Sequence, residues 1–214
     1  MNASQIPDIR IVDDNAKPWR TDGAYVLYWM TTNRRLRSNF ALQHAVWLAE
    51  QHGVPLVILE ALRLDYQWAS PRLHQFIIQG MRDNAQRAEG TPGVTYFPYV
   101  ESAAGDGKGL LRTLSQNAVG VVTDYFPCFF VPRMVAAAAK KLDVRLQSVD
   151  ANGVMPLQAT DRVYTTAASF RRFLHKTILD HVLPLPERAP LAALSSMAYA
   201  LDLSNTTRWP YADF

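Results

Sequence analysis

Continuous apolar runs alternate with helically spaced apolar residues through about the first 150 positions of the chain. The run from Tyr25 to Met30 has no polar alternation, as expected for a strand that is covered on both faces of a sheet. Comparable runs follow, and we expect strands at 25–30, 56–62, 94–100, 119–123 and 144–149. Between them, apolar residues three and four positions apart predict helices near 39–53, 70–90, 110–117 and 132–142. Strands and helices that alternate in this way predict a parallel sheet with right-handed crossovers.

Capping residues indicate where two of these helices start and stop. Ser38 is placed to cap a helix that begins near Asn39, and Gly53 follows the last turn of that helix. Ser70 and Pro71 form a second helix start, with proline at the first helical position. These signals support the predicted succession of elements.

The pattern favours one α/β domain: a doubly wound, Rossmann-like, five-stranded parallel sheet in the order 3-2-1-4-5, with helices on both faces. We expect this domain to occupy residues 1–182. Prolines at 184, 186 and 190 are typical of a linker, so residues 183–214 are expected to form a linker and one helix over 191–203. Aromatic residues at 209, 211 and 214 would normally be buried, which suggests that the surface covering them belongs to a missing partner.

Composition and charge indicate where the protein is found in the cell but say little about its function. The 214 residues include 22 Lys and Arg against 19 Asp and Glu, and the formal charge of +3 is too weak to establish nucleic-acid binding. Cys128 is the only cysteine, so no disulfide can form within the chain, and we expect a buried, inert thiol. The sequence shows no signal peptide and no apolar run of membrane-spanning length, so we expect a soluble cytoplasmic protein.

The turn that follows the first buried strand is the first candidate site, because ligands bind open α/β sheets beyond the carboxyl ends of the strands. It contains Arg34, Arg35 and Arg37, which could meet an anion at the start of the next helix. The alternative is a solvated cluster in which one arginine pairs with a neighbouring carboxylate. Neither phosphate-binding glycine fingerprint is present, and the loop at 107–109 lacks the P-loop spacing.

A second candidate follows the strand at 119–123. Asp124 could accept a hydrogen bond from a ligand or cap its own loop, while Tyr125, Phe126, Phe129 and Phe130 offer a flat apolar wall. The alternative interpretation is a proline-braced loop whose aromatic residues close the top of the core.

The other chemistry-bearing residues form no catalytic or metal-binding pattern. The five histidines show no ligand spacing, so we predict no metal site, and no serine-centred nucleophile turn is present. The basic residues between 171 and 176 are expected to form a solvated helix face rather than a nucleic-acid site. We therefore predict no catalytic residue in this chain.

Taken together, these segments resemble the N-terminal α/β domain of the DNA photolyase and cryptochrome family, most closely the class II cyclobutane pyrimidine dimer photolyases. The resemblance covers about residues 8 to 180, and its matching residues are Asp22-Gly23, Tyr28-Trp29-Met30, Arg35, Asn39, Ala41-Leu42, Val54-Pro55-Leu56, Val122-Thr123-Asp124, Pro127, Pro132-Arg133, Val149-Asp150-Ala151, Arg171 and His175-Lys176. Two places depart from the family pattern. Asn152-Gly153 stands where a His-Asn pair is usual, and Cys128-Phe129 stands where class II members commonly carry Leu-Arg.

The resemblance implies a part in light-dependent repair of pyrimidine dimers that this chain does not perform alone. In photolyases a large helical C-terminal domain holds FAD and the DNA lesion, and this chain ends where that domain would begin. The implied partners are that FAD-binding domain, in cis or in trans, and DNA only through the parent protein. The implied cofactor of the present domain is an antenna chromophore: a deazaflavin, a folate or a flavin.

The resemblance and the strand-end positions together predict a pocket for a planar chromophore. Its expected residues are Met30, Arg35, Asn39, Asp124, Tyr125 and Phe126. Two other functions stay open: a stand-alone nucleotide- or flavin-binding module, and a structural domain that only docks to a flavin-bearing partner. The docking domain would take no small ligand and would expose an apolar face around residues 209–214.

Overall fold

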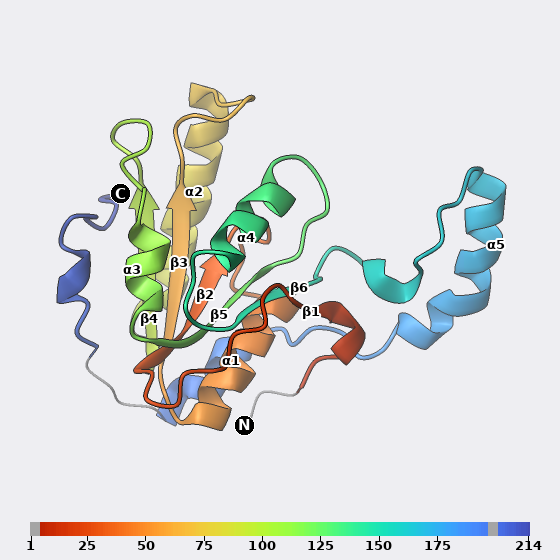
Figure 1. Cartoon of the computed structure of the whole chain (residues 1–214), viewed down its shortest axis with the longest axis horizontal. Coiled ribbons are helices and arrows are strands. Elements are labelled where there is room, and N and C mark those ends of the chain that lie inside the picture. Colours follow the sequence, from red (N-terminus) through yellow and green to blue (C-terminus); the bar gives the residue numbers. More distant parts are fainter. Residues whose placement is uncertain (1–4, 197–200) are drawn as a thin grey trace.

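The computed structural model describes residues 5–196 and 201–214 and shows a six-stranded sheet flanked by helices (Figure 1). The strands are β1 (Ile11–Asp13), β2 (Tyr25–Met30), β3 (Leu56–Leu62), β4 (Val94–Val100), β5 (Ala118–Asp124) and β6 (Leu146–Val149). Their order across the sheet is β1-β6-β5-β2-β3-β4. Strands β2 to β6 pair in parallel, which confirms the predicted order of the five parallel strands.

The predicted count of five strands is wrong, because β1 adds a sixth. It pairs antiparallel with β6 at the edge of the sheet, with Val12 opposite Ser148. β1 has only three residues, and none of them is fully buried. An edge strand of this length has neither an apolar run nor a clear alternation, so the sequence carries no periodic signal for it.

Two helices cover each face of the sheet. The helices are α1 (Phe40–His52), α2 (Pro71–Ala88), α3 (Leu110–Ser115), α4 (Val131–Ala139) and α5 (Ala167–Thr177). Side chains of α1 and α2 share one core with Tyr28 of β2, whereas those of α3 and α4 share the other core with Leu27 and Trp29. Because successive residues of β2 enter opposite cores, all six are buried, and the strand shows no polar alternation.

The two predicted helix starts differ in their outcome. Asn39, not Ser38, caps α1: its side-chain oxygen accepts from the backbone N–H groups of residues 41 and 42 at 3.0 and 3.4 Å. Ser38 has a φ of 46° and turns the chain into the helix instead. The predicted end of α1 at Gly53 is confirmed, with a left-handed φ of 64°. Ser70 caps α2 as predicted, with Pro71 in its first turn.

The predicted helix over 191–203 is only partly present. Pro190–Ser196 forms a 3-10 helix, and its Leu191 and Leu194 pack in the same core as α1. Residues 197–200 lie outside the described residues, and residues 201–203 are not helical. The predicted domain boundary between 182 and 183 stays a prediction.

In the C-terminal tail (residues 209–214), Trp209 is covered by its own chain, contrary to the expectation of a missing partner, whereas Tyr211 and Phe214 expose 49% and 38% of their surface. Trp209 is buried in the core beneath α3, and its Nε1 donates to the carbonyl of Asp106 at 2.8 Å. The ring of Tyr211 packs on Phe97 of β4 with centroids 4.4 Å apart. The end of the chain therefore binds the α3 side of the sheet.

Helix α5 stands apart from the sheet (Figure 1), and none of its residues is buried. Thr166 caps it by accepting a hydrogen bond from the backbone N–H of Ser169 at 3.2 Å. Among the residues that the structure describes, no helix is both long and apolar enough to cross a membrane.

Candidate functional site

Asp124 anchors the loop between β2 and α1 from beneath. It ends β5, is fully buried, and accepts hydrogen bonds from the backbone N–H groups of Thr31, Thr32 and Asn33 at 2.8, 2.8 and 3.1 Å. Its other oxygen accepts from the hydroxyl of Tyr28 at 2.7 Å. Converging backbone N–H groups make an anion site, and here the anion is the protein's own carboxylate. Asp124 therefore holds the loop in place and presents no oxygen to the surface.

Asn39 belongs to the same buried cluster. Its Nδ2 donates to the hydroxyl of Tyr28 at 2.9 Å and to the carbonyls of Asn33 and Arg35 at 3.1 Å each. Burial, and then the nearby carboxylate of Asp124, raises the pKa of Tyr28 well above its ordinary value. Tyr28 therefore keeps its proton and remains a donor to Asp124.

The other predicted site residues divide between core and surface. Met30 is fully buried in the core beneath α1. Arg35 is exposed, and its Nη2 donates to the carbonyl of Ser38 at 3.2 Å. Tyr125 and Phe126 are half-buried at the start of the loop between β5 and α4. The structure thus leaves Arg35, Tyr125 and Phe126 accessible, whereas Met30, Asn39 and Asp124 are buried.

For Arg34 the structure decides between the two sequence interpretations. Its Nη1 lies 3.1 Å from a carboxylate oxygen of Glu60 in β3, and its Nη2 donates to the carbonyl of Ala61 at 2.7 Å. Glu60 is fully buried and also accepts from Asn84 at 2.9 Å and from Tyr96 at 2.6 Å. Burial, followed by this carboxylate, raises the pKa of Tyr96 far above its ordinary value. Arg34 is therefore paired inside the protein.

Sequence reasoning missed Glu60, although a signal was present. It is the only charged residue in the otherwise apolar run of β3, and a charge in a buried strand needs an internal partner.

Aromatic side chains form a bridge above the carboxyl ends of the strands. We call this set the aromatic rim, and it consists of Tyr66, Trp68, Phe126, Phe129 and Phe130. The rings of Trp68 and Phe129 meet edge to face at 5.0 Å, and Tyr66 lies 6.2 Å from Phe130. These contacts join the loop after β3 to the loop after β5, so they span the end of β2, which lies between those strands. Trp68 and Phe129 expose 50% and 65% of their surface.

The structure confirms neither sequence interpretation of the loop after β5 in full. Phe129 and Phe130 are exposed and do not close the core. Phe129 adopts a φ of 59°, a conformation that is rare for a bulky residue and turns its ring toward Trp68. The prediction of a buried thiol at Cys128 is wrong, because this loop lies outside the core and exposes Cys128. Tyr66 and Trp68 were missed, although aromatic residues directly after a buried strand were the available signal.

Four buried polar atoms on the same carboxyl side have no hydrogen-bond partner among the described residues. They are Thr32 Oγ1, Asn33 Nδ2, Tyr66 Oη and His74 Nε2. The imidazole of His74 lies 5.5 Å from the ring of Tyr66, beside the aromatic rim. An unpaired buried polar group costs about 1–3 kcal/mol, so a bound ligand or water at this end of the sheet would relieve that cost. Asn33 Nδ2 can only donate, whereas the two hydroxyls and the imidazole can donate or accept.

This arrangement is suited to holding a planar molecule. The aromatic rim offers ring faces, and the unpaired polar atoms offer hydrogen bonds of defined direction. Within residues 5–196 and 201–214, no group of three His, Cys, Asp or Glu side chains is placed to hold a metal ion.

Comparison with known proteins gives a consistent result at low identity. No protein-family model matches the chain. It is 27% identical over 167 residues to the deoxyribodipyrimidine photo-lyase of Methanothermobacter thermautotrophicus, covering 78% of this chain and 36% of that protein. It is 26% identical over 170 residues to the deoxyribodipyrimidine photo-lyase of Arabidopsis thaliana and 29% identical over 175 residues to that of Oryza sativa subsp. japonica; each alignment covers 77% of this chain and 33% of the relative.

The chain thus spans about a third of the length of the curated relatives that it matches. All of these relatives carry the same description, and the alignments cover more than three quarters of this chain. The chain is therefore homologous to the N-terminal region of the deoxyribodipyrimidine photo-lyase family.

Proposed function

We propose that this chain is the antenna domain of a photolyase-like DNA repair protein of the class II type, and that it binds a planar chromophore at the carboxyl ends of β2, β3 and β5. The observation that carries the proposal is the aromatic rim, in which Tyr66 and the neighbouring His74 carry buried polar atoms without a hydrogen-bond partner among the described residues. A deazaflavin, a folate or a flavin fits this chemistry, since each combines a planar heteroaromatic ring with hydrogen-bonding atoms. When bound, such a group absorbs light and passes the excitation to FAD.

In this proposal the residues have separate tasks. The aromatic rim packs against the chromophore and excludes water from it. Arg35, Tyr125 and Phe126 lie at the accessible surface around it, while Asp124 and Asn39 keep the loop after β2 in the shape that presents Asn33. Catalysis and DNA contact belong to the FAD-binding helical domain, supplied in cis or in trans.

The test is an absorbance and fluorescence titration of the purified protein with deazaflavin, methenyl folate, FAD and ATP. We expect one of the three chromophores to bind, and Trp68→Ala and Phe129→Ala each to weaken its binding about five- to 150-fold, since stacking on one ring contributes roughly 1–3 kcal/mol. Phe76→Ala is the matched control, because Phe76 is an exposed aromatic residue of α2 outside the rim. Tight ATP binding without any chromophore would instead establish the nucleotide-binding module, and light-dependent dimer repair by this chain alone would refute the assignment of catalysis to another domain.

One observation favours docking to a flavin-bearing partner as a second function. The segment 154–185, which includes α5, exposes large apolar side chains that a stable surface normally covers. Val163, Leu179 and Leu183 expose 86%, 80% and 73% of their surface. We propose that an FAD-binding helical domain covers this segment.

The docking function is tested with the part of the Methanothermobacter relative that lies outside its alignment with this chain, expressed separately. We expect the two proteins to co-elute in size-exclusion chromatography, and Leu179→Asp with Leu183→Asp to abolish the complex while circular dichroism stays unchanged. Co-elution that survives the double substitution would exclude this segment as the docking surface.

A further inference from the structure

The outer edge of β4 carries unpaired backbone groups. The carbonyl of Gly93 accepts a hydrogen bond from β3 at 2.8 Å, and the N–H of Glu101 donates one to β3 at 3.0 Å. The backbone groups of odd-numbered residues of β4 therefore face β3, and those of even-numbered residues face outward. Pro98 is one of the outward positions, as expected for proline in an edge strand. Its carbonyl accepts from the N–H of Ala212 at 2.9 Å, where the tail crosses the edge.

The edge is open on the N-terminal side of this crossing. The N–H and carbonyl of Tyr96 and the carbonyl of Val94 face outward and have no partner among the described residues. An edge of this kind is a template for a further strand, since a second backbone can supply the missing hydrogen bonds.

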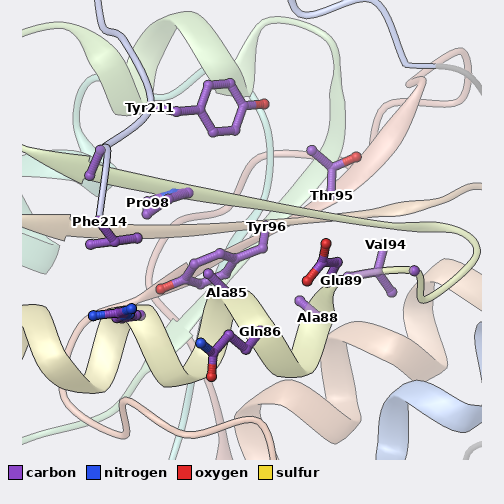
Figure 2. Close-up of a pocket in the computed structure, with 13 residues that line it drawn as sticks. Ala85, Gln86, Ala88, Glu89, Val94, Thr95, Tyr96, Pro98, Tyr211 and Phe214 are labelled. Atoms are coloured by element: carbon purple, nitrogen blue, oxygen red, sulfur yellow. The ribbon is translucent and has the colours of Figure 1, made fainter.

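A groove of about 580 Å³ runs along this open edge, between α2, β4 and the tail (Figure 2). Figure 2 shows the ring of Tyr96 on its floor, with Tyr211 and Phe214 on the tail side. The groove is therefore bounded by aromatic side chains next to free backbone groups, which is the combination that strand-addition sites use.

Two charges, one on α2 and one directly after it, lie at opposite ends of the groove. Glu89 lies at the end where α2 leads into the start of β4, and Arg82 precedes it by two helical turns, about 10 Å away. Neither forms an ion pair with any residue within 5–196 or 201–214. The groove thus has a negative end and a positive end. Side chains four positions apart in an extended chain lie on the same face about 13 Å apart, a separation that the flexible side chains of both partners can match.

We propose that the outer edge of β4 binds an extended peptide segment of another protein as an added strand, with a basic side chain at Glu89 and an acidic side chain at Arg82. The backbone of that segment pairs with Tyr96 and Val94, and its side chains pack against Tyr96, Tyr211 and Phe214. This surface lies at the edge of the sheet, away from the aromatic rim, and the inference is independent of the proposed function.

The probes are four acetylated and amidated pentapeptides with a Val-Thr-Val centre, whose two ends are Lys and Glu, Lys and Lys, Glu and Glu, or Ala and Ala, so that both end side chains lie on the same face of the extended chain. Binding to the full chain is followed by NMR, together with hydrogen exchange at the Tyr96 amide. We expect the Lys/Glu peptide to bind about two- to fivefold more tightly than the Lys/Lys or the Glu/Glu peptide, because each of those mismatches one charge of the groove. Binding of the Lys/Glu peptide should also slow hydrogen exchange at the Tyr96 amide. No slowing with any peptide at millimolar concentration overturns the proposal.

Substitutions on the exposed face of α2 test the assignment of the charges. Arg82→Glu should shift the preference to the Lys/Lys peptide, and Glu89→Lys should shift it to the Glu/Glu peptide. Arg87→Glu is the control, because Arg87 is on α2 but does not line the groove, and the ranking should stay as in the unsubstituted protein. An unchanged ranking of the peptides with Arg82→Glu refutes the proposal. The proposal is also refuted if, without peptide, exchange at the Tyr96 amide slows as the protein concentration rises, since a second copy of the chain would then occupy this edge.

Discussion

Replacing Asp124 by asparagine is the most direct perturbation of the cluster that shapes the candidate site. The carboxylate accepts three backbone N–H groups on one oxygen and the phenol of Tyr28 on the other. Asparagine keeps a single oxygen and turns the other acceptor into a donor. If that oxygen stays with the loop, the new NH2 group faces the Tyr28 oxygen, to which Asn39 already donates.

The expected cost follows from these contacts. The phenol proton of Tyr28 loses the one acceptor that the described residues offer it, and a buried donor without a partner costs about 1–3 kcal/mol. The three loop hydrogen bonds also lose the assistance of the negative charge, which roughly halves the strength of each. We expect Asp124→Asn to lower the free energy of unfolding by about 3–5 kcal/mol, a large part of the 5–15 kcal/mol typical of a domain.

Urea unfolding followed by circular dichroism measures this loss. Asp143→Asn is the control, since Asp143 is exposed, and its effect should stay within about 0.5 kcal/mol. Tyr28→Phe combined with Asp124→Asn should cost less than the sum of the two single changes, because the second change no longer strands a phenol proton. A loss below about 1 kcal/mol for Asp124→Asn, or simple additivity of the pair, would refute the anchoring role.

Three further predictions concern other parts of the fold. Burial lowers the pKa of His44 from its ordinary value of 6.5, so the unfolded state binds a proton at this residue more readily than the folded state. The free energy of unfolding should therefore be undiminished above about pH 6.5 and should decrease as the pH falls below that value. His44→Gln should flatten this loss in urea midpoints measured from pH 7 to pH 5, and an unchanged slope would exclude His44 as its source. Trp209→Ala should cost about 3–5 kcal/mol in the same assay, and a change below 1 kcal/mol would show that the tail is not part of the core. Gly23→Ala should be strongly destabilising, because the added Cβ would stand 2.3 Å from a backbone nitrogen of β5. Gly80→Ala, whose added Cβ meets nothing within 4 Å, should raise the free energy of unfolding by about 0.5–1 kcal/mol. Equal melting temperatures for the two variants would contradict at least one of these expectations.

The candidate site shows the limit of sequence reasoning most clearly at its charged residues. The sequence identifies Asp124 and Arg34 as candidates because they follow buried strands. It does not decide their roles, because each could face a ligand or a partner within the protein. The structure gives Asp124 three backbone donors from a loop more than 90 positions away and gives Arg34 a carboxylate from β3. Pairings of this kind depend on which strands become neighbours, and no local spacing reports them.

By itself, the sequence determined the five parallel strands, their order and the end of α1. A strand covered on both faces must be apolar throughout, and a helix end needs a residue such as Gly53 that accepts a left-handed conformation. Only the tertiary structure decided what covers Trp209, that β1 completes the sheet, that Cys128 is exposed, and that the loops after β3 and β5 meet in the aromatic rim. The spacing of apolar residues indicates that a segment is buried. Which segment it packs against depends on long-range contacts, and the order of residues along the chain does not show these.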